Sequence, residues 1–206
     1  MRHPLFARAY DRLIAPAMER ELSSLRRELL AGLHGRVLEV GAGNGLSFVH
    51  YPPSVTEVVA LEPEPYLRAQ AELAANVAPV AVTVREGLAE TLPFAAASFD
   101  AAVASIVLCS VADPARALSE LRRVLRPGGK LCFFEHVRSD RVPKATVQAL
   151  LDRSGVWPLL AGGCHCARET VNAIAVAGFR VDASRRVALG PAWLHTNPWM
   201  LGTARA

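Results

Sequence analysis

The chain has 206 residues, of which 51% are hydrophobic and 20% charged, and its formal net charge is +4 at pH 7. This composition is typical of a folded domain and excludes an intrinsically disordered chain. Apolar runs stay well short of the roughly 20 residues of a spanning helix, and the arginine-rich start is unlike a signal peptide. Because the basic residues are dispersed and not interleaved with aromatic ones, we expect no nucleic-acid partner.

The first 31 residues predict a helical segment, in which apolar residues recur at helical spacing and Pro16 interrupts the pattern. One apolar stripe consists of Met18, Leu22, Leu25 and Leu29. Such a stripe predicts packing of the helix on its own domain, and peripheral contact with a membrane through residues 1–31 is the alternative.

Strands and helices then alternate along the chain. The predicted strands are Arg36–Val40, Glu57–Leu61, Val80–Arg85, Phe99–Cys109 and Lys130–Val137. The predicted helices between them are Tyr66–Asn76 and Pro114–Leu125, and Arg126–Gly129 is a predicted turn. Alternation at this spacing indicates βαβ units and a parallel sheet.

After residue 140 the order of elements changes. Val142–Leu160 and Arg168–Ala177 are predicted helices, followed by predicted strands over Gly178–Leu189 and Trp199–Arg205. Two late strands in succession predict a hairpin added to the edge of the sheet.

The four cysteines are Cys109, Cys132, Cys164 and Cys166, and two of them fall inside predicted strands. This usage indicates reduced thiols and a cytoplasmic protein instead of a disulfide framework. The sequence Cys164-His165-Cys166 does not complete a tetrahedral ligand set and no second cysteine pair follows, so we predict no metal site.

The strongest local signal is Leu-Glu-Val-Gly-Ala-Gly-Asn-Gly at residues 38–45, directly after the first strand. Glycines there let the backbone turn sharply and approach a ligand closely. The third glycine comes one residue too early for the dinucleotide pattern, which argues against an oxidoreductase. Glu39 suits a ligand with an ammonium group, and Glu62, after the second strand, can accept hydrogen bonds from both ribose hydroxyls.

Further motifs follow the glycine loop in order: Glu62-Pro63, Leu92-Pro93-Phe94, Ser98-Phe99-Asp100 and the segment 125–129. With them the chain resembles class I S-adenosylmethionine-dependent methyltransferases of the ubiquinone and menaquinone type. Another set is Tyr51-Pro52-Pro53, Val107 to Val111, Glu135-His136-Val137, Gly163-Cys164 and Arg168-Glu169. By this second set it is most similar to the methyltransferase-like thiol S-methyltransferases.

The resemblance implies an α/β, Rossmann-like fold with helices on both faces of a seven-stranded, mostly parallel sheet. The implied strand order is 3-2-1-4-5-7-6, with strand 7 antiparallel. We expect a single methyltransferase domain over residues 1–206. It would comprise a helical lid (1–35), a cofactor-binding core (36–137) and a substrate-side region with the C-terminal hairpin (138–206).

The resemblance also implies which residues contact S-adenosyl-L-methionine, whose product is S-adenosyl-L-homocysteine. Gly41, Gly43 and Gly45, with Ala42 and Asn44, would wrap the cofactor, and Glu39 would face its ammonium. Glu62 would hold the ribose, Pro63, Leu88 and Ala89 would lie beside the adenine, and Ser105 and Ile106 would line the methionine arm. Tyr10 would cap the cofactor carboxylate or pack in the lid. Leu88 stands where the family usually has Asp, so adenine recognition would depend on backbone groups and packing.

Two residues are candidates on the acceptor side. His136, at the carboxyl end of the fifth strand, could act as the catalytic base that takes a thiol proton, or be a histidine bonded to a backbone carbonyl. Cys109 could line the substrate pocket or pack in the core. We expect methyl transfer to a small-molecule acceptor, and the second set of motifs favours a thiol.

Alternatives to the thiol are a quinone, a lipid or another small metabolite methylated at C, O or N. A second alternative is a non-catalytic module that binds S-adenosylmethionine. We expect a monomer or homodimer in the cytoplasm, with the membrane-peripheral alternative left open by the first helix.

Overall fold

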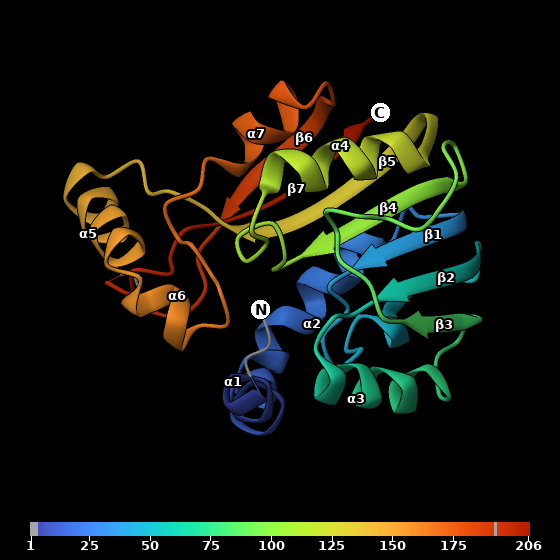
Figure 1. The fold of residues 1–206 in the computed structure, drawn as a ribbon, viewed down its shortest axis with the longest axis horizontal. Helices are drawn as coiled ribbons and strands as arrows, with labels where there is room; N and C mark the ends of the chain where they lie inside the picture. Colours follow the sequence, from blue (N-terminus) through green and yellow to red (C-terminus); the bar gives the residue numbers. More distant parts are fainter. Residues whose placement is uncertain (1–3, 192) are drawn as a thin grey trace.

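The computed structural model of the chain describes residues 4–191 and 193–206. A seven-stranded sheet in the order β3-β2-β1-β4-β5-β7-β6 forms its centre (Figure 1). The strands are β1 (Gly35–Val40), β2 (Val55–Leu61), β3 (Val82–Arg85), β4 (Phe99–Ser105), β5 (Leu125–His136), β6 (Arg180–Val187) and β7 (Trp199–Arg205). Strands β1 to β5 pair in parallel, and β7 runs antiparallel to β5 and β6. The expected topology is confirmed, as is the late hairpin.

Side chains of the central strands alternate between two hydrophobic cores, because successive residues of a strand face opposite sides of the sheet. In β1, Leu38 and Val40 belong to one core and Val37 to the other. Helices α4 (Pro114–Val124) and α7 (Thr170–Val176) cover the first face. Helices α2 (Ala15–Leu30) and α3 (Pro65–Ala75) cover the second, so the central strands of the sheet are buried on both sides (Figure 1).

The remaining helices gather where the parallel strands end. Helices α1 (Pro4–Ala9), α5 (Val142–Ser154) and α6 (Val156–Leu160) lie beyond the carboxyl ends of β1 to β4 (Figure 1). A short 3-10 turn, η2 (Phe48–His50), follows the glycine loop. This edge is where ligands bind in open α/β sheets, since the loops after the strands converge there.

The N-terminal segment is helical as predicted, but Pro16 does not interrupt it. A π-helical turn, η1 (Tyr10–Ile14), joins α1 to α2, and Pro16 lies in the first turn of α2, where its missing N–H costs little. In the stripe, Leu22 and Leu29 are buried, and Met18 and Leu25 pack against the same core. The expectation that this stripe packs inward is confirmed, and the membrane alternative for residues 1–31 stays a prediction. Among the described residues, no helix has the length and apolar character needed to cross a membrane.

Three predicted boundaries are wrong. The fourth strand ends at Ser105 instead of continuing to Cys109, because Ile106 adopts a positive φ of 62° and turns the chain. The predicted turn at Arg126–Gly129 is a bulge within β5, where the register against β4 shifts. The predicted helix Val142–Leu160 divides into α5 and α6 at Gly155, whose φ of 71° ends α5.

Candidate functional site

The glycine loop between β1 and η2 has positive φ at each of its three glycines, which strains any other residue type there. A side chain at Gly41 would lie 2.4 Å from Val107 Cγ2, and one at Gly45 would lie 2.8 Å from Phe48. These two glycines are therefore required by the protein's own packing. At Gly43, by contrast, the nearest atom is Tyr10 Cε1 at 3.9 Å. The loop thus leaves space at Gly43, facing the N-terminal helix.

Glu62 ties this loop to the end of β2. Its Oε2 accepts the Gly43 N–H at 2.8 Å and its Oε1 accepts the Glu64 N–H at 2.9 Å. Each carboxylate oxygen has a second lone pair, so both remain able to accept a ligand hydroxyl. Burial raises the pKa of Glu62, and the two N–H groups oppose that shift by favouring the ionised form.

Glu39 lies beneath the loop and is buried. Its Oε2 accepts a hydrogen bond of 2.8 Å from the Tyr51 hydroxyl, which explains the tyrosine in the Tyr51-Pro52-Pro53 motif. Burial raises the pKa of Glu39 to about 7, so this carboxyl group titrates near neutral pH. A cationic group placed beside it would favour the ionised form.

The N-terminal helix is fastened to the loop by Asp11, a residue that sequence reasoning missed. Its two carboxylate oxygens accept hydrogen bonds of 2.9 Å, one from Asn44 Nδ2 and one from the Tyr66 hydroxyl. Tyr10, the preceding residue, lies beside Gly43. The only sequence signal was an acidic residue next to Tyr10, and neither partner is close in sequence.

The residues expected beside the adenine follow β2 and β3. Glu62 N–H donates to the Arg85 carbonyl, which brings the ends of these strands together. Ala89 is buried, whereas Leu88 is 49% exposed and pairs only with Thr91 in an isolated bridge. Leu88 thus presents an apolar surface at this edge of the sheet. Pro63 is half-buried next to Glu62, and Ala42 is buried with its N–H bonded to the Leu61 carbonyl.

Glu135 organises the turn that follows β4. Its Oε1 accepts the N–H groups of Val107 and Leu108 at 2.9 and 2.8 Å, and its Oε2 accepts that of Cys109 at 3.1 Å. Ile106, in a conformation that β-branched residues rarely adopt, donates its N–H to the Phe134 carbonyl at 2.7 Å. Burial raises the pKa of Glu135 to about 7, although the three N–H bonds favour its ionised form. As strand alternation predicts, Glu135 points away from His136.

The same turn is held from its other side by Arg168. One guanidinium nitrogen donates to the Leu108 carbonyl and the other donates to that of Val111 at 2.8 Å. Arg168 of the Arg168-Glu169 motif therefore serves the conformation of the turn at residues 106–111. Ser105 and Ile106, expected on the methionine arm, open this turn and are both half-buried.

His136 is buried at the end of β5. Its Nδ1 lies 3.3 Å from Cys164 Sγ and its ring centroid lies 3.6 Å from that of Trp199. Burial lowers the pKa of His136 to about 3, so the imidazole is neutral at pH 7. A base of such low pKa has little driving force to take a proton from a thiol. Cys109 is also buried, in the turn after β4 and not inside the strand.

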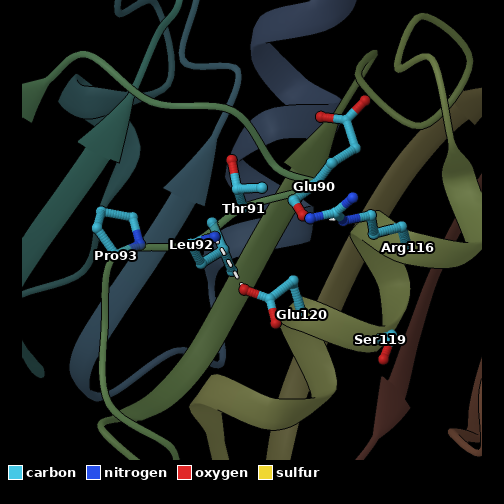
Figure 2. Close-up of a pocket in the computed structure, with 7 residues that line it drawn as sticks. All are labelled: Glu90, Thr91, Leu92, Pro93, Arg116, Ser119 and Glu120. Atoms are coloured by element: carbon cyan, nitrogen blue, oxygen red, sulfur yellow. Dashed lines mark hydrogen bonds between the residues drawn. The ribbon is translucent and has the colours of Figure 1, made fainter.

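Two hollows on the surface lie elsewhere. Figure 2 shows one between the turn at Glu90–Pro93 and helix α4, where Glu120 accepts the Leu92 N–H and Arg116 donates to the Glu90 carbonyl. A second lies between α4 and α7. None of the predicted site residues lines either hollow, so both are distinct from the candidate site around the glycine loop and the turn after β4.

The methyltransferase domain family matches residues 38–133. Human thiol S-methyltransferase TMT1B is 33% identical over 207 aligned positions, covering 93% of this chain and 82% of that protein. The demethylmenaquinone methyltransferase of Renibacterium salmoninarum is 38% identical but covers only 54% of this chain and 46% of its own length.

Solved structures show the same fold. An S-adenosylmethionine-dependent methyltransferase of Thermotoga maritima superimposes with a TM-score of 0.71 at 22% identity, covering 97% of each chain. The glycine loop and the acid after β2 lie at the sheet edge where such a fold binds its ligand. The chain therefore belongs to the class I S-adenosylmethionine-dependent methyltransferases, in the family that contains the thiol S-methyltransferases.

Proposed function

We propose that the protein transfers the methyl group of S-adenosylmethionine to a small thiol. The observation that carries this proposal is the extent of the likeness to thiol S-methyltransferase TMT1B, which spans 93% of the chain. That span includes most of residues 138–206, where α5, α6 and the C-terminal hairpin lie. The menaquinone relative matches 54% of the chain. Because acceptor choice depends on the region outside the cofactor core, the longer match is the more informative one.

The cofactor is proposed to lie across the carboxyl ends of β1, β2 and β4. Its ribose hydroxyls would donate to Glu62, and its ammonium would lie near Glu39. Gly43 offers the open face of the loop, and Tyr10 lies opposite it, 3.9 Å from where a Cβ of residue 43 would be, in position to cap the cofactor carboxylate.

Other parts of the cofactor would contact residues around this edge. These residues are Gly41, Ala42, Asn44 and Gly45 in the loop, Pro63, Leu88 and Ala89 beside the adenine, and Ser105 and Ile106 beside the methionine arm. The apolar exposed side chain of Leu88 suits the flat face of a purine, with polar recognition left to the backbone.

The reaction forms a bond between the acceptor sulfur and the methyl carbon and breaks the bond between that carbon and the sulfonium sulfur. The electron pair of the broken bond stays on the sulfur of S-adenosylhomocysteine, and the thiol proton goes to solvent. Because the cofactor supplies the leaving group, the protein contributes alignment of the two sulfurs with the methyl carbon. Near-attack positioning of this kind can lower a barrier by roughly 7–11 kcal/mol.

The test is methyl transfer from labelled S-adenosylmethionine to a panel of aliphatic and aromatic thiols, hydrogen sulfide, a quinol and a phenol. Methylated thiols with an unmodified quinol and phenol are the expected result. Methylation of the quinol or phenol without the thiols would contradict the thiol proposal and favour the metabolite alternative. Tight cofactor binding without any product would count against the proposal as well.

The lid role of residues 1–35 can be tested at Asp11. Asp11→Ala removes the acceptor of the bonds from Asn44 and Tyr66, each worth about 1 kcal/mol. We expect the dissociation constant for S-adenosylmethionine, measured by calorimetry, to rise by about tenfold. Asp140→Ala, at an exposed ion pair with Arg186, is the control and should bind normally. Equal affinity of the two variants would show that the N-terminal helix does not cover the cofactor.

The position of the cofactor ammonium can be tested through Glu39. Burial raises the pKa of Glu39 to about 7, so the carboxylate is the main form only above neutral pH. An ammonium group binds the carboxylate better than the neutral acid, so affinity for S-adenosylmethionine should weaken as pH falls through 7. Glu39→Gln should bind weakly and with little pH dependence in this range. The control is Glu57→Gln, near the amino-terminal end of β2 in an ion pair with Arg36, which should retain the wild-type profile. A wild-type profile in Glu39→Gln would contradict the proposed contact between Glu39 and the cofactor ammonium.

Because the apolar stripe of residues 18, 22, 25 and 29 packs on the domain, a membrane contact of residues 1–31 would involve other, exposed side chains. Leu5 and Leu13 are exposed by 81% and 70%, and a contact through them stays a prediction. Co-sedimentation with anionic vesicles tests this membrane contact. Gel filtration tests the separate expectation of a monomer or homodimer.

A further inference from the structure

Cys109, His136 and Cys164 form a buried thiol–imidazole cluster at the carboxyl edge of the sheet. One ligand atom from each residue lies within 4.8 Å of the other two, and Cys164 Sγ lies 3.3 Å from His136 Nδ1. None of the three residues is more than 7% exposed. The ligand atoms come from three separate segments: the turn after β4, the end of β5, and the loop between α6 and α7.

Each member of the cluster is held by contacts outside it. Glu135 accepts the Cys109 N–H, and the Cys109 carbonyl accepts the His165 N–H at 2.8 Å, which docks the Cys164 loop on the turn. Asp152 fixes the other end of that loop by accepting the N–H groups of Cys166 and Ala167. The His136 ring packs on Trp199. Such outer contacts are what orients the ligands of a metal site.

The spacing and chemistry of these atoms suit a thiophilic ion. Tetrahedral zinc, with bonds of about 2.3 Å to sulfur and about 2.0 Å to nitrogen, places its ligand atoms roughly 3.5–3.8 Å apart. Two thiolates and a neutral imidazole balance the charge of a divalent cation, which lowers the cost of burying it. Calcium and magnesium prefer oxygen ligands, and the cluster supplies none. We propose that Cys109, His136 and Cys164 bind a zinc-like ion.

Three protein ligands leave the fourth position of a tetrahedral ion open, as in catalytic zinc sites. Cys166 Sγ lies 4.0 Å from Cys164 Sγ, but Cys166 is not part of the cluster. Ile106 packs against the group of buried thiols formed by Cys109, Cys164 and Cys166, and it is also proposed beside the methionine arm of the cofactor. The fourth position therefore belongs to the sulfur of the acceptor, an assignment that rests on the proposed thiol methylation.

The structure also gives a reason for such an ion at this point. Glu135 accepts three N–H groups of the turn and His136 Nδ1 faces Cys164, so both side chains already serve structural contacts at this point. A thiol that coordinates a divalent metal loses its proton to solvent and becomes a thiolate. The thiolate sulfur would then bond to the methyl carbon as the bond from that carbon to the sulfonium sulfur breaks. The neutral thioether, a weaker ligand, would leave, with S-adenosylhomocysteine as the other product.

Binding of the ion by the full-length protein is the first readout. We expect the reduced protein to bind one zinc ion per chain. When cobalt replaces zinc, its absorption spectrum should show thiolate charge-transfer bands and the ligand-field bands of a tetrahedral ion. Cys164→Ser and Cys109→Ser should weaken binding about a hundredfold or more. Cys132→Ser removes a buried thiol outside the cluster and should bind like wild type. Thermal unfolding of each variant confirms that it folds. Three outcomes would overturn the site: no ion bound by the wild-type protein, an equal loss of metal affinity in Cys132→Ser, or a disulfide between Cys109 and Cys164 in place of the ion.

The open position has its own test. An acceptor thiol should shift the ligand-field bands of the cobalt form, whereas the corresponding alcohol should not, and Cys166→Ser should retain the ion. Loss of the ion in Cys166→Ser would show a closed, four-ligand site and overturn the assignment of the fourth position. Thiol methylation that persists in metal-free protein would also overturn it, while leaving the proposed function standing. An ion bound with the expected spectrum but no methylated thiol would refute the proposed function and leave the metal site intact.

Discussion

Glu135→Ala is expected to lower the free energy of unfolding by about 3–5 kcal/mol, since it leaves the N–H groups of Val107, Leu108 and Cys109 without their acceptor. Each unsatisfied buried donor costs roughly 1–3 kcal/mol, and removing a buried carboxylate that was costly to desolvate returns part of that total. For a chain of this size the midpoint of thermal unfolding should fall by roughly 10 °C. Urea and thermal unfolding, followed by circular dichroism, measure both quantities.

The control for this prediction is Glu169→Ala, which removes a carboxylate from an exposed ion pair with Arg138. Surface pairs contribute little, so its unfolding free energy should stay within about 0.5 kcal/mol of wild type. Glu135→Gln should fall between the two, because the amide oxygen can still accept two N–H groups while its NH₂ group faces the third. If Glu135→Ala were as stable as Glu169→Ala, the carboxylate would not be what holds the turn after β4.

Gly43→Ala is expected to weaken S-adenosylmethionine binding by about tenfold or more, which corresponds to at least about 1.4 kcal/mol. A methyl group at Gly43 meets only Tyr10, 3.9 Å away, so the unliganded protein has room for it. That room is the space proposed for the cofactor, where backbone and ligand must approach closely. Isothermal titration calorimetry measures the loss of affinity directly.

The strain of a non-glycine residue at positive φ, roughly 1–2 kcal/mol, has to be separated from the effect on binding. Gly128→Ala is the matched control for this strain, because Gly128 also has a positive φ, of 76°, and an added side chain there has no atom within 4 Å. Both variants should lose similar stability, and only Gly43→Ala should lose affinity. Normal cofactor binding by Gly43→Ala would place the cofactor away from this face of the loop. Gly41→Ala is a poorer test, since its side chain would collide with Val107 in the protein itself.

Much of the fold was predictable because it depends on local patterns. Short, nearly continuous apolar runs mark β1 and β2 as buried strands, and the late strand at Trp199–Arg205 was predicted with the bounds it has. The glycine loop and Glu62 were recognisable because their spacing along the chain reflects a turn that joins strand to helix. These features can be predicted from residues that are close together in the sequence.

The sequence was misleading where a distant residue controls the backbone. Residues 106–109 continue the apolar run of β4, so periodicity extended the strand to Cys109. The chain turns at Ile106 instead, since Glu135, which is 26 to 28 residues away, accepts the N–H groups that a strand would use for pairing. Asp11 was missed for the same reason, as Asn44 and Tyr66 are 33 and 55 residues from it.

By itself, then, the sequence determined the layered α/β fold, the strand order implied by family resemblance, and the position of the cofactor loop. Only the tertiary structure brought Cys109, His136 and Cys164 together, and spacing along the chain had argued against any metal at Cys164-His165-Cys166. The physical reason is that hydrophobic periodicity and turn chemistry act between near neighbours in the chain. A buried cluster is instead defined by groups from distant segments that meet only after the sheet and its flanking loops have packed.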